Sequence, residues 1–149
     1  MNTNMDKLFG SVMRGEVFAK IDFSVGIVDV RDVAATHIRA LQVPRASGRY
    51  CTWSDLLSYS DMYEMLRGLR PHISRNLPHL LLPSSLNAFI VAFVYLKFGK
   101  GVMDVVAGGL GKYPRFDCTR TTRELGVVFR PIAETVAASA DAMDEWKLV

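Results

Sequence analysis

Two carboxylates and a histidine stand close together in the first quarter of the chain, where they could exchange protons. Asp29 and Asp32 lie within Val28–Leu41, and His37 follows in the same stretch. Paired carboxylates do acid–base chemistry when their surroundings separate their pKa values. Asp32, however, stands where a helix N-cap is expected, and Asp29 alternates to a different side of the preceding strand. We therefore do not expect an acid–base pair here, and we expect His37 to be a satisfied structural histidine.

The other reactive residue types show no useful spacing. The histidines lack metal-ligand spacing with carboxylates or cysteines. Cys51 and Cys118 form neither a metal-binding pattern nor a disulfide framework, which predicts free thiols in a reducing compartment. The Gly108–Gly111 run lacks the order of a phosphate-binding loop, so we expect a flexible connection. The residues alone thus predict no catalytic and no metal-ligating set.

The stretch around the two carboxylates predicts a short strand that turns directly into a helix. The segment 27–30 is rich in β-branched residues, and Ala34, Ile38 and Leu41 repeat at the spacing of one apolar helical face. A β-rich segment is expected over Val17–Arg31, with an irregularity at Gly26.

Apolar periodicity and capping residues place the remaining elements. We expect a helix from Asp6 to about Met13 that stops at Gly15, a strand over Gly48–Trp53, a helix capped by Ser58, Ser60 or Asp61 that ends at Arg70–Pro71, a short helix from Asp117 to a left-handed end at Gly126, and a terminal helix after Pro131. Their inner faces are expected to carry Met62, Met65, Leu66 and Leu69, then Ile132, Val136, Ser139 or Ala140, Met143 and Trp146.

Length and composition suit one folded domain. The chain has 149 residues, of which 50% are hydrophobic and 22% are charged, with a formal net charge of +3. This small excess is spread along the chain and does not favour nucleic-acid binding. The uncharged stretch from Asn76 to Leu96 is interrupted by two prolines, and its dense part of about eleven residues is short of the roughly 20 that a membrane span needs. We expect a buried or partner-facing helix there, no membrane attachment, and a cytoplasmic location.

Four motifs occur in an order that resembles one enzyme superfamily. The stretch 28–34 reads Val-Asp-Val-Arg-Asp-Val-Ala and is followed by His37 and Ala40. It resembles the central signature of the C-terminal half of extended short-chain dehydrogenase/reductases, in the NAD-dependent epimerase/dehydratase superfamily. The later matches are Ser-Gly-Arg-Tyr at 47–50, Phe-Asp to Glu-Leu-Gly at 116–126, and Phe-Arg-Pro at 129–131. The closest branch looks like the dihydroflavonol reductase and cinnamoyl-CoA reductase group.

The resemblance implies a fold and a set of structural residues. It runs from about Leu8 to Trp146 and is weakest over Leu80–Leu110. It implies an α/β chain, mainly helical with a few short strands, that forms the C-terminal substrate-binding lobe without the complete Rossmann sheet, so that residues 1–149 are a single partial domain. Its structural signature residues are Asp29, Arg31, Asp32, Gly48, Asp117 and Gly126.

The resemblance also implies a class of reaction. Complete members are NAD(P)-dependent oxidoreductases that act on a CH–OH or carbonyl group of a small molecule. A helix ending in Gly lies beside their substrate pocket, which makes Phe9 and Met13 pocket candidates, with ordinary core packing as the alternative. The nucleotide-sugar branch has a phosphate-clamping Arg near the position of Val25, and valine cannot supply that contact. A nucleotide-sugar substrate is therefore not expected.

The cofactor and catalytic motifs of the family are not found in this sequence. Hydride transfer in the family needs a Gly-rich turn for the pyrophosphate and a Ser with a Tyr-x-x-x-Lys pair. The five tyrosines are followed four residues later by Ser54, Tyr63, Arg67, Gly99 and Asp117. We expect this chain alone to hold no NAD(P) and no catalytic residue, as in a truncated or split enzyme whose partner is a separate N-terminal half. The alternatives are a non-enzymatic interaction module that self-associates and, more weakly, membrane association through Leu80–Leu96.

Overall fold

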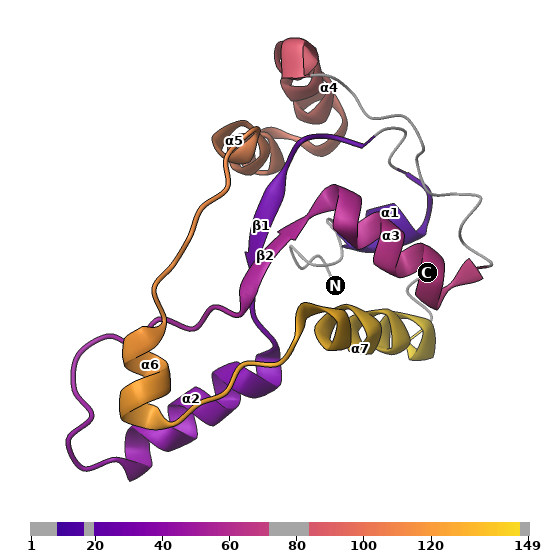
Figure 1. Cartoon of the computed structure of the whole chain (residues 1–149). Coiled ribbons are helices and arrows are strands. Elements are labelled where there is room, and N and C mark those ends of the chain that lie inside the picture. The colour runs from indigo at the N-terminus through magenta and orange to yellow at the C-terminus, as the bar shows by residue number, and fades with distance from the viewer. Residues whose placement is uncertain (1–8, 17–19, 72–83, 147–149) are drawn as a thin grey trace.

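The chain folds as a mainly helical assembly around a small antiparallel sheet. The computed structural model describes residues 9–16, 20–71 and 84–146. Its elements are α1 (Ser11–Met13), β1 (Ser24–Ile27), α2 (Val30–Gln42), β2 (Asp55–Ser58), α3 (Tyr59–Leu69), a 3₁₀ turn (Ser84–Leu86), α4 (Asn87–Phe98), α5 (Lys100–Gly109), α6 (Thr119–Leu125) and α7 (Ile132–Glu145) (Figure 1). This mixture of helices with two paired strands is consistent with the expected α/β fragment.

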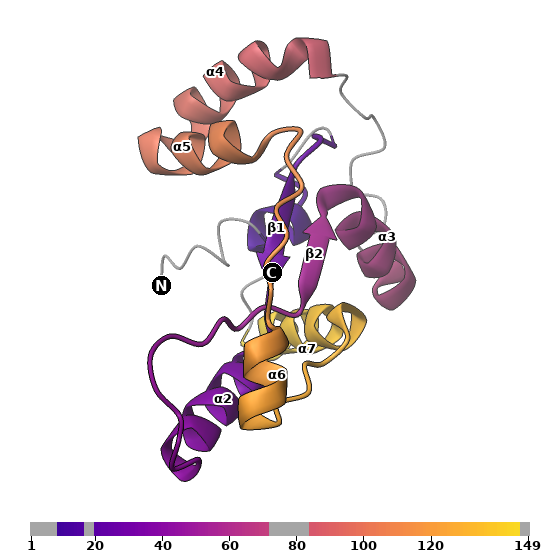
Figure 2. The same cartoon turned by 60° about the vertical axis from the view of Figure 1, so that its left-hand side comes forward.

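The sheet lies in the middle of the molecule, between two helical ends. β1 and β2 pair antiparallel, with Ser24 opposite Ser58 and Ile27 opposite Asp55. The α3 and α7 helices pack together beside the sheet, α4 and α5 form a hairpin at one end, and α2 and α6 lie at the other (Figures 1 and 2). In the part of the chain that the structure describes, no helix is long and apolar enough to cross a membrane.

The hydrophobic core belongs to the sheet, α1, α3 and α7. Its buried residues are Phe9, Val12, Met13, Phe23, Leu57, Tyr59, Met62, Tyr63, Leu66, Val136, Ala140 and Met143. The inner faces expected for α3 and α7 supply much of this cluster. Leu69 and Trp146 are exceptions, because their side chains are 38% and 70% exposed rather than packed inward.

Helix boundaries follow the predicted caps closely. Ser58 caps α3 by accepting a hydrogen bond from the Asp61 N–H, and this helix ends at Leu69, just before Arg70–Pro71. Asp117 accepts from the Thr119 N–H at 2.8 Å, and Gly126 takes the left-handed conformation after α6 with φ +66°. The expected first helix is described only from residue 9 onward, so Asp6 lies outside the described residues.

Two expected features near glycines are wrong. Gly26 lies in the regular part of β1, opposite Leu56. Its backbone lies close to the Trp53 side chain, since a Cβ on Gly26 would be 2.7 Å from Trp53 Nε1. Gly108 and Gly109 are the last residues of α5 rather than a flexible connection, because the end of this helix packs on the ring of Phe23.

The strand predicted over Gly48–Trp53 is also wrong. β2 begins later, at Asp55, and the preceding residues form no strand. A strand needs a neighbouring backbone to complete its hydrogen bonds. Residues 48–53 have no such neighbour in the described part of the chain, and side chains of α6 occupy one side of the segment, as described below.

Candidate functional site

Asp29 lies where β1 passes into α2 and is nearly fully buried. It, and not Asp32, is the N-cap of α2, because the helix begins at Val30 and the Asp29 side chain accepts from the Arg31 N–H at 2.8 Å. Its two carboxylate oxygens also accept from Arg31 Nε at 2.8 Å and Nη2 at 2.7 Å. Thr135 of α7 donates a further hydrogen bond at 3.1 Å. The predicted cap at Asp32 was therefore placed one turn too late.

These contacts fix the charge of Asp29. The hydrogen bonds from Arg31 hold the pKa of the Asp29 carboxyl well below its usual range, although burial alone would raise that pKa. A carboxylate with so low a pKa is a poor proton acceptor at neutral pH. Asp29 is therefore suited to holding the start of α2 and not to acid–base chemistry.

Asp32 joins the start of α2 to a segment far along the chain. Its side chain is 2% exposed, accepts from the Arg130 backbone N–H at 2.7 Å and pairs with the Arg130 guanidinium. Glu134 on α7 bridges the two arginines, at 3.2 Å from Arg31 and 3.3 Å from Arg130. We call these five residues, Asp29, Arg31, Asp32, Arg130 and Glu134, the carboxylate clamp.

The clamp joins two motifs that lie far apart in the sequence. The Val-Asp-Val-Arg-Asp stretch supplies Asp29, Arg31 and Asp32, and the Phe-Arg-Pro turn supplies Arg130. The contacts of Arg130 and Thr135 were not predicted from the sequence. The first motif contains two aspartates and the second contains an arginine, but residue types alone do not show which aspartate pairs with it. The clamp fastens α2 to the turn before α7.

A large open cleft lies beside the clamp. It has a volume of about 710 Å³ and is lined by residues 26–31 and by one side of α7 from Thr135 to Trp146. This volume lies within the range of about 300–1,000 Å³ typical of small-molecule sites. The lining is mostly apolar, with the Asp29–Arg31 pair as its charged part. By size and chemistry this cleft suits an apolar ligand or chain segment with one polar group.

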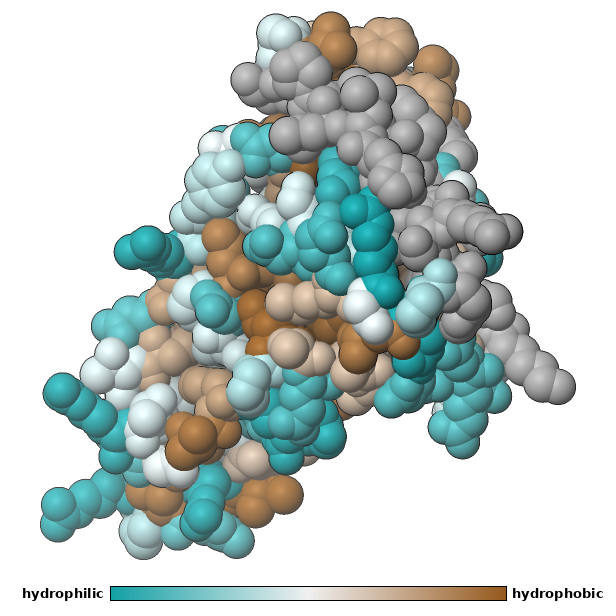
Figure 3. Space-filling model, turned by 45° about the vertical axis from the view of Figure 1, so that its right-hand side comes forward, coloured by the Kyte–Doolittle hydropathy of each residue, from teal (hydrophilic) through white to brown (hydrophobic). Residues whose placement is uncertain are grey.

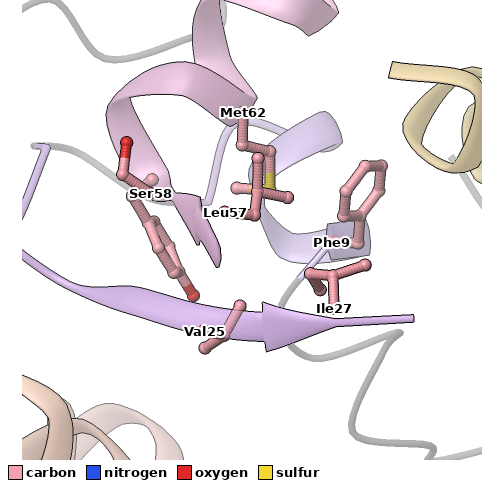
Figure 4. Close-up of a pocket in the computed structure, with 7 residues that line it drawn as sticks. Phe9, Val25, Ile27, Leu57, Ser58 and Met62 are labelled. Carbon is pink, nitrogen blue, oxygen red and sulfur yellow. The ribbon is translucent and has the colours of Figure 1, made fainter. Parts of the chain in front are cut away.

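The pocket candidates Phe9 and Met13 lie elsewhere, in the core. Phe9 lines a hollow of about 20 Å³ between β1 and α3, where its ring converges with the side chains of Ile27, Leu57 and Met62 (Figure 4). A hollow of this size holds about one water molecule. Met13 is 2% exposed in the same cluster. Both act as core residues here, and their place beside a substrate stays a prediction.

The segment 47–53 presents one bonded side and one open side. Arg120 of α6 donates to the carbonyls of Ser47 at 2.8 Å and Arg49 at 3.3 Å, and Thr121 donates to that of Cys51 at 2.5 Å. The backbone groups of Tyr50 and Thr52, which alternate with Arg49 and Cys51 along the chain, have no backbone partner in the described residues. We call these groups the open side of the segment. Gly48 opens this segment with φ +74°, a conformation that favours glycine.

The two cysteines meet at this same segment. Burial, followed by a thiol–thiol hydrogen bond with Cys51, raises the pKa of Cys118 to about 11. Both thiols are free and partly buried. Their contact was not visible in the sequence because they come from segments far apart in it. A thiol with a raised pKa is a weak nucleophile at neutral pH, so the contact packs the segment against α6.

The apolar face predicted for α2 points away from the molecule. Ile38 is 55% and Leu41 is 89% exposed, and Val30 at the start of the same helix is 78% exposed. The buried residues of α2 are instead Asp32 and Thr36. The Ala34–Ile38–Leu41 face is therefore not covered by the described part of this chain, and α2 carries an uncovered apolar stripe.

The described helix starts do not fit the pyrophosphate of a nicotinamide dinucleotide. Such a group needs free N–H groups at the start of a helix that follows a Gly-rich turn. At α2 the Asp29 carboxylate already occupies that position, and at α3 Ser58 does, with the carboxylate of Asp61 beside it. The starts of α4, α6 and α7 have no side-chain cap, but none of these helices follows a Gly-rich turn. His37 is exposed and bonds the Val33 carbonyl at 2.8 Å, and the described residues contain no cluster of three metal-ligating side chains.

Comparison with known proteins gives partial relatives and a clear fold match. No family model matches the chain. A stretch of 51 residues is 37% identical to tetraketide alpha-pyrone reductase 2 of Arabidopsis thaliana, and 73 residues are 33% identical to cinnamoyl-CoA reductase CAD2 of Medicago truncatula. These stretches are 34% and 49% of this chain but 16% and 22% of the two relatives. The crystal structure of gox2253 matches 96% of the chain with a TM-score of 0.67 at 20% identity, and the chain covers 44% of it.

These matches support a general relationship to NAD(P)-dependent reductases of the short-chain, epimerase-like type. The sequence matches are low in identity and limited to part of the chain. The structural match is under 25% identical and shows the fold alone. The chain spans less than half of the solved relative and about a fifth of the curated relatives.

Proposed function

We propose that this chain is the C-terminal, substrate-binding portion of an NAD(P)-dependent oxidoreductase in the dihydroflavonol reductase and cinnamoyl-CoA reductase-like branch. The reaction is reduction of a carbonyl, or oxidation of the corresponding alcohol, in a small molecule. Residues 1–149 act as a single partial domain in the cytoplasm. The cofactor and the Ser/Tyr/Lys set are supplied by a different segment, so the chain alone transfers no hydride.

The open side of the segment 47–53 carries this proposal. The backbone groups of Tyr50 and Thr52 lack partners in the described residues, while α6 holds the other side of this segment. Unpaired backbone groups of this kind are expected where a neighbouring strand belongs to another unit. The exposed apolar stripe of α2 lies on the helix that packs against α6. Both features favour an end of the molecule that is completed by a further part of the fold.

The signature residues are suited to a structural role in this lobe. Asp29, Arg31 and Asp32 hold α2 within the clamp, and Gly48 opens the unpaired segment. Asp117 accepts from the first N–H of α6, and Gly126 ends this helix. The cleft beside the clamp is the site that we assign to the substrate in the completed enzyme. Its apolar lining suits the body of such a substrate, and Arg31 lies at its charged part.

A titration with reduced cofactor tests the proposal. The purified chain is titrated with NADPH and NADH by calorimetry, and oxidation of either cofactor is followed by absorbance with an aldehyde or ketone present. We expect no saturable binding and no turnover, because no described helix combines an uncapped start with the Gly-rich turn that a pyrophosphate needs. Binding at micromolar strength, or oxidation above the protein-free rate, would overturn the proposal.

The uncovered surfaces also favour a second candidate, a non-enzymatic interaction module. In that case the α2 stripe and the open side of 47–53 are covered by a second copy of the chain. Light scattering after size exclusion separates the two candidates. A dimer that Leu41→Asp converts to a monomer favours the module, whereas a wild-type monomer favours a lobe that awaits a different unit.

A further inference from the structure

Helix α4 lies outside the core, and most of its residues are apolar. None of the residues from Asn87 to Leu96 is charged, and the one charged residue of the helix is Lys97. α4 packs chiefly against α5 and the preceding 3₁₀ turn. Ile90 is buried at 4% exposure, but Phe89 is 62% and Leu96 is 82% exposed. Large apolar side chains that gather in the open in this way mark an interaction surface.

The apolar surface caps one end of the molecule. Figure 3 shows brown and tan residues gathered at the end where α4 and α5 lie in Figure 1. Tyr95, 51% exposed, stands next to Leu96 and carries a hydroxyl on an otherwise apolar ring. Tyrosine is enriched where a bilayer meets water because its ring and hydroxyl suit the two sides of that boundary.

The turn between α4 and α5 is basic. The two helices carry Lys97 and Lys100, which flank Gly99, against one acid, Asp104. Lys100 is exposed. Basic residues beside an exposed apolar helix are attracted to anionic lipid head groups. A second copy of the same hairpin would instead bring lysines together with only Asp104 to pair them.

The length of α4 decides how it can meet a bilayer. Its 12 residues extend about 18 Å at 1.5 Å per residue, against a hydrocarbon thickness of about 30 Å. The helix can therefore lie in the interface but cannot cross it. The sequence favoured a buried or partner-facing helix here, and the exposure of Phe89 and Leu96 removes the first of these.

We propose that α4 binds the surface of an anionic lipid bilayer. Phe89, Tyr95 and Leu96 enter the boundary between head groups and acyl chains, and Lys100 stays at the level of the lipid phosphates. The surface lies at the opposite end of the molecule from α2 and α6 (Figure 2). Lipid binding therefore leaves the α2 stripe open to the further unit proposed above.

Vesicle flotation tests this proposal with a matched control. The full chain is mixed with phosphatidylcholine vesicles, with or without phosphatidylserine, and compared with a Phe89→Ser/Leu96→Ser variant. Leu41→Ser is the control, since Leu41 is 89% exposed but lies on α2. We expect wild type and Leu41→Ser to float with the anionic vesicles, and the α4 variant to bind at least about tenfold more weakly. Raised salt should weaken the binding of wild type.

Three results would overturn the proposal. The first is a wild-type chain that stays unbound, or that binds neutral vesicles as strongly as anionic ones. The second is equal loss of binding in Leu41→Ser and in the α4 variant, which would make the effect non-specific. The third is a wild-type dimer in light scattering that the α4 substitutions convert to a monomer, with no vesicle binding by either protein. That result would assign α4 to self-association.

Discussion

The centre of the molecule and its α2–α6 end bury different mixtures of side chains. At the centre, α3 packs against α7 and the sheet through apolar residues such as Leu66 and Val136. At the α2–α6 end the polar Asp32 and Thr121 are buried together with the apolar Leu125, while the apolar Leu41 is exposed. Both regions use amphipathic helices of similar sequence pattern, yet α3 and α7 turn their apolar faces inward and α2 does not.

This difference indicates that the apolar faces at the centre are covered by the chain itself, whereas the apolar face of α2 is not. Apolar burial is non-directional and can close around any suitable neighbour. Buried carboxylates and hydroxyls need particular partners, which the clamp and the carbonyl of Cys51 provide. The end held by polar contacts thus keeps its apolar stripe and one backbone side free for another surface.

Removal of the Asp32 carboxylate should have the largest effect on this comparison. Asp32→Ala leaves the Arg130 N–H without its acceptor and leaves the guanidinium with Glu134 alone. We expect a loss of about 3–5 kcal/mol in the free energy of unfolding, measured by urea titration. Asp104→Ala, at an exposed carboxylate on α5, is the control and should change stability by less than about 0.5 kcal/mol. Equal effects of the two substitutions would contradict a clamp.

A pair of leucines compares the two regions directly. Leu66→Ala opens a cavity at a side chain with 0% exposure, whereas Leu41→Ala trims one with 89% exposure. We expect the first to lower the free energy of unfolding by about 2–5 kcal/mol and the second by less than about 0.5 kcal/mol. Thermal or urea unfolding of the isolated chain measures both. A large loss in Leu41→Ala would mean that α2 packs inward after all.

Gly26 tests the junction between the two regions. A Cβ at Gly26 would lie 2.7 Å from Trp53 Nε1, so Gly26→Ala should displace the indole and lower stability by about 1–3 kcal/mol. Gly68→Ala is the control on α3, where a Cβ meets nothing within 4 Å. It should leave stability unchanged or raise it by up to about 1 kcal/mol. If both glycines tolerate alanine equally, the Trp53 contact is not tight.

Substitution of Asp29 should have a smaller effect on stability, and this effect should depend on pH. Because its pKa is lowered in the folded chain, its stabilisation is fully present above the ordinary carboxyl pKa of about 4 and is lost as the pH falls below that value. Asp29→Asn keeps a cap but loses the ion pair, so it should cost about 1–2 kcal/mol at pH 7 and flatten the acid limb of the stability curve. Urea titrations from pH 7 to pH 3 measure this. An unchanged acid limb would contradict the assigned ion pair.

Local signals in the sequence predicted the limits of the helices well. Ser58, Asp117 and Gly126 act within a few residues of their own position, so their effects can be deduced without knowing the fold. The inner faces of α3 and α7 were also predictable, because the core that receives them is formed by this chain.

Features that depend on a distant partner were not predictable. The Ala34–Ile38–Leu41 face has the same periodicity as the face of α3, but periodicity does not say whether a neighbour is present to cover it. Asp32 was assigned to a local cap because its actual partner, Arg130, is 98 residues away. The strand predicted at 48–53 failed for the same reason, since residue type cannot supply the second strand.

Hydrogen exchange of single amides in the isolated chain tests the central claim most directly. Ser54 and Tyr59 donate to the carbonyls of Ile27 and Phe23 at 2.9 and 3.0 Å, whereas the Tyr50 and Thr52 amides face the open side. The account predicts protection at the first two positions and exchange within about tenfold of the unstructured rate at the last two. Equal protection at all four would show that the side is already paired and would contradict an α2–α6 end that awaits a further unit.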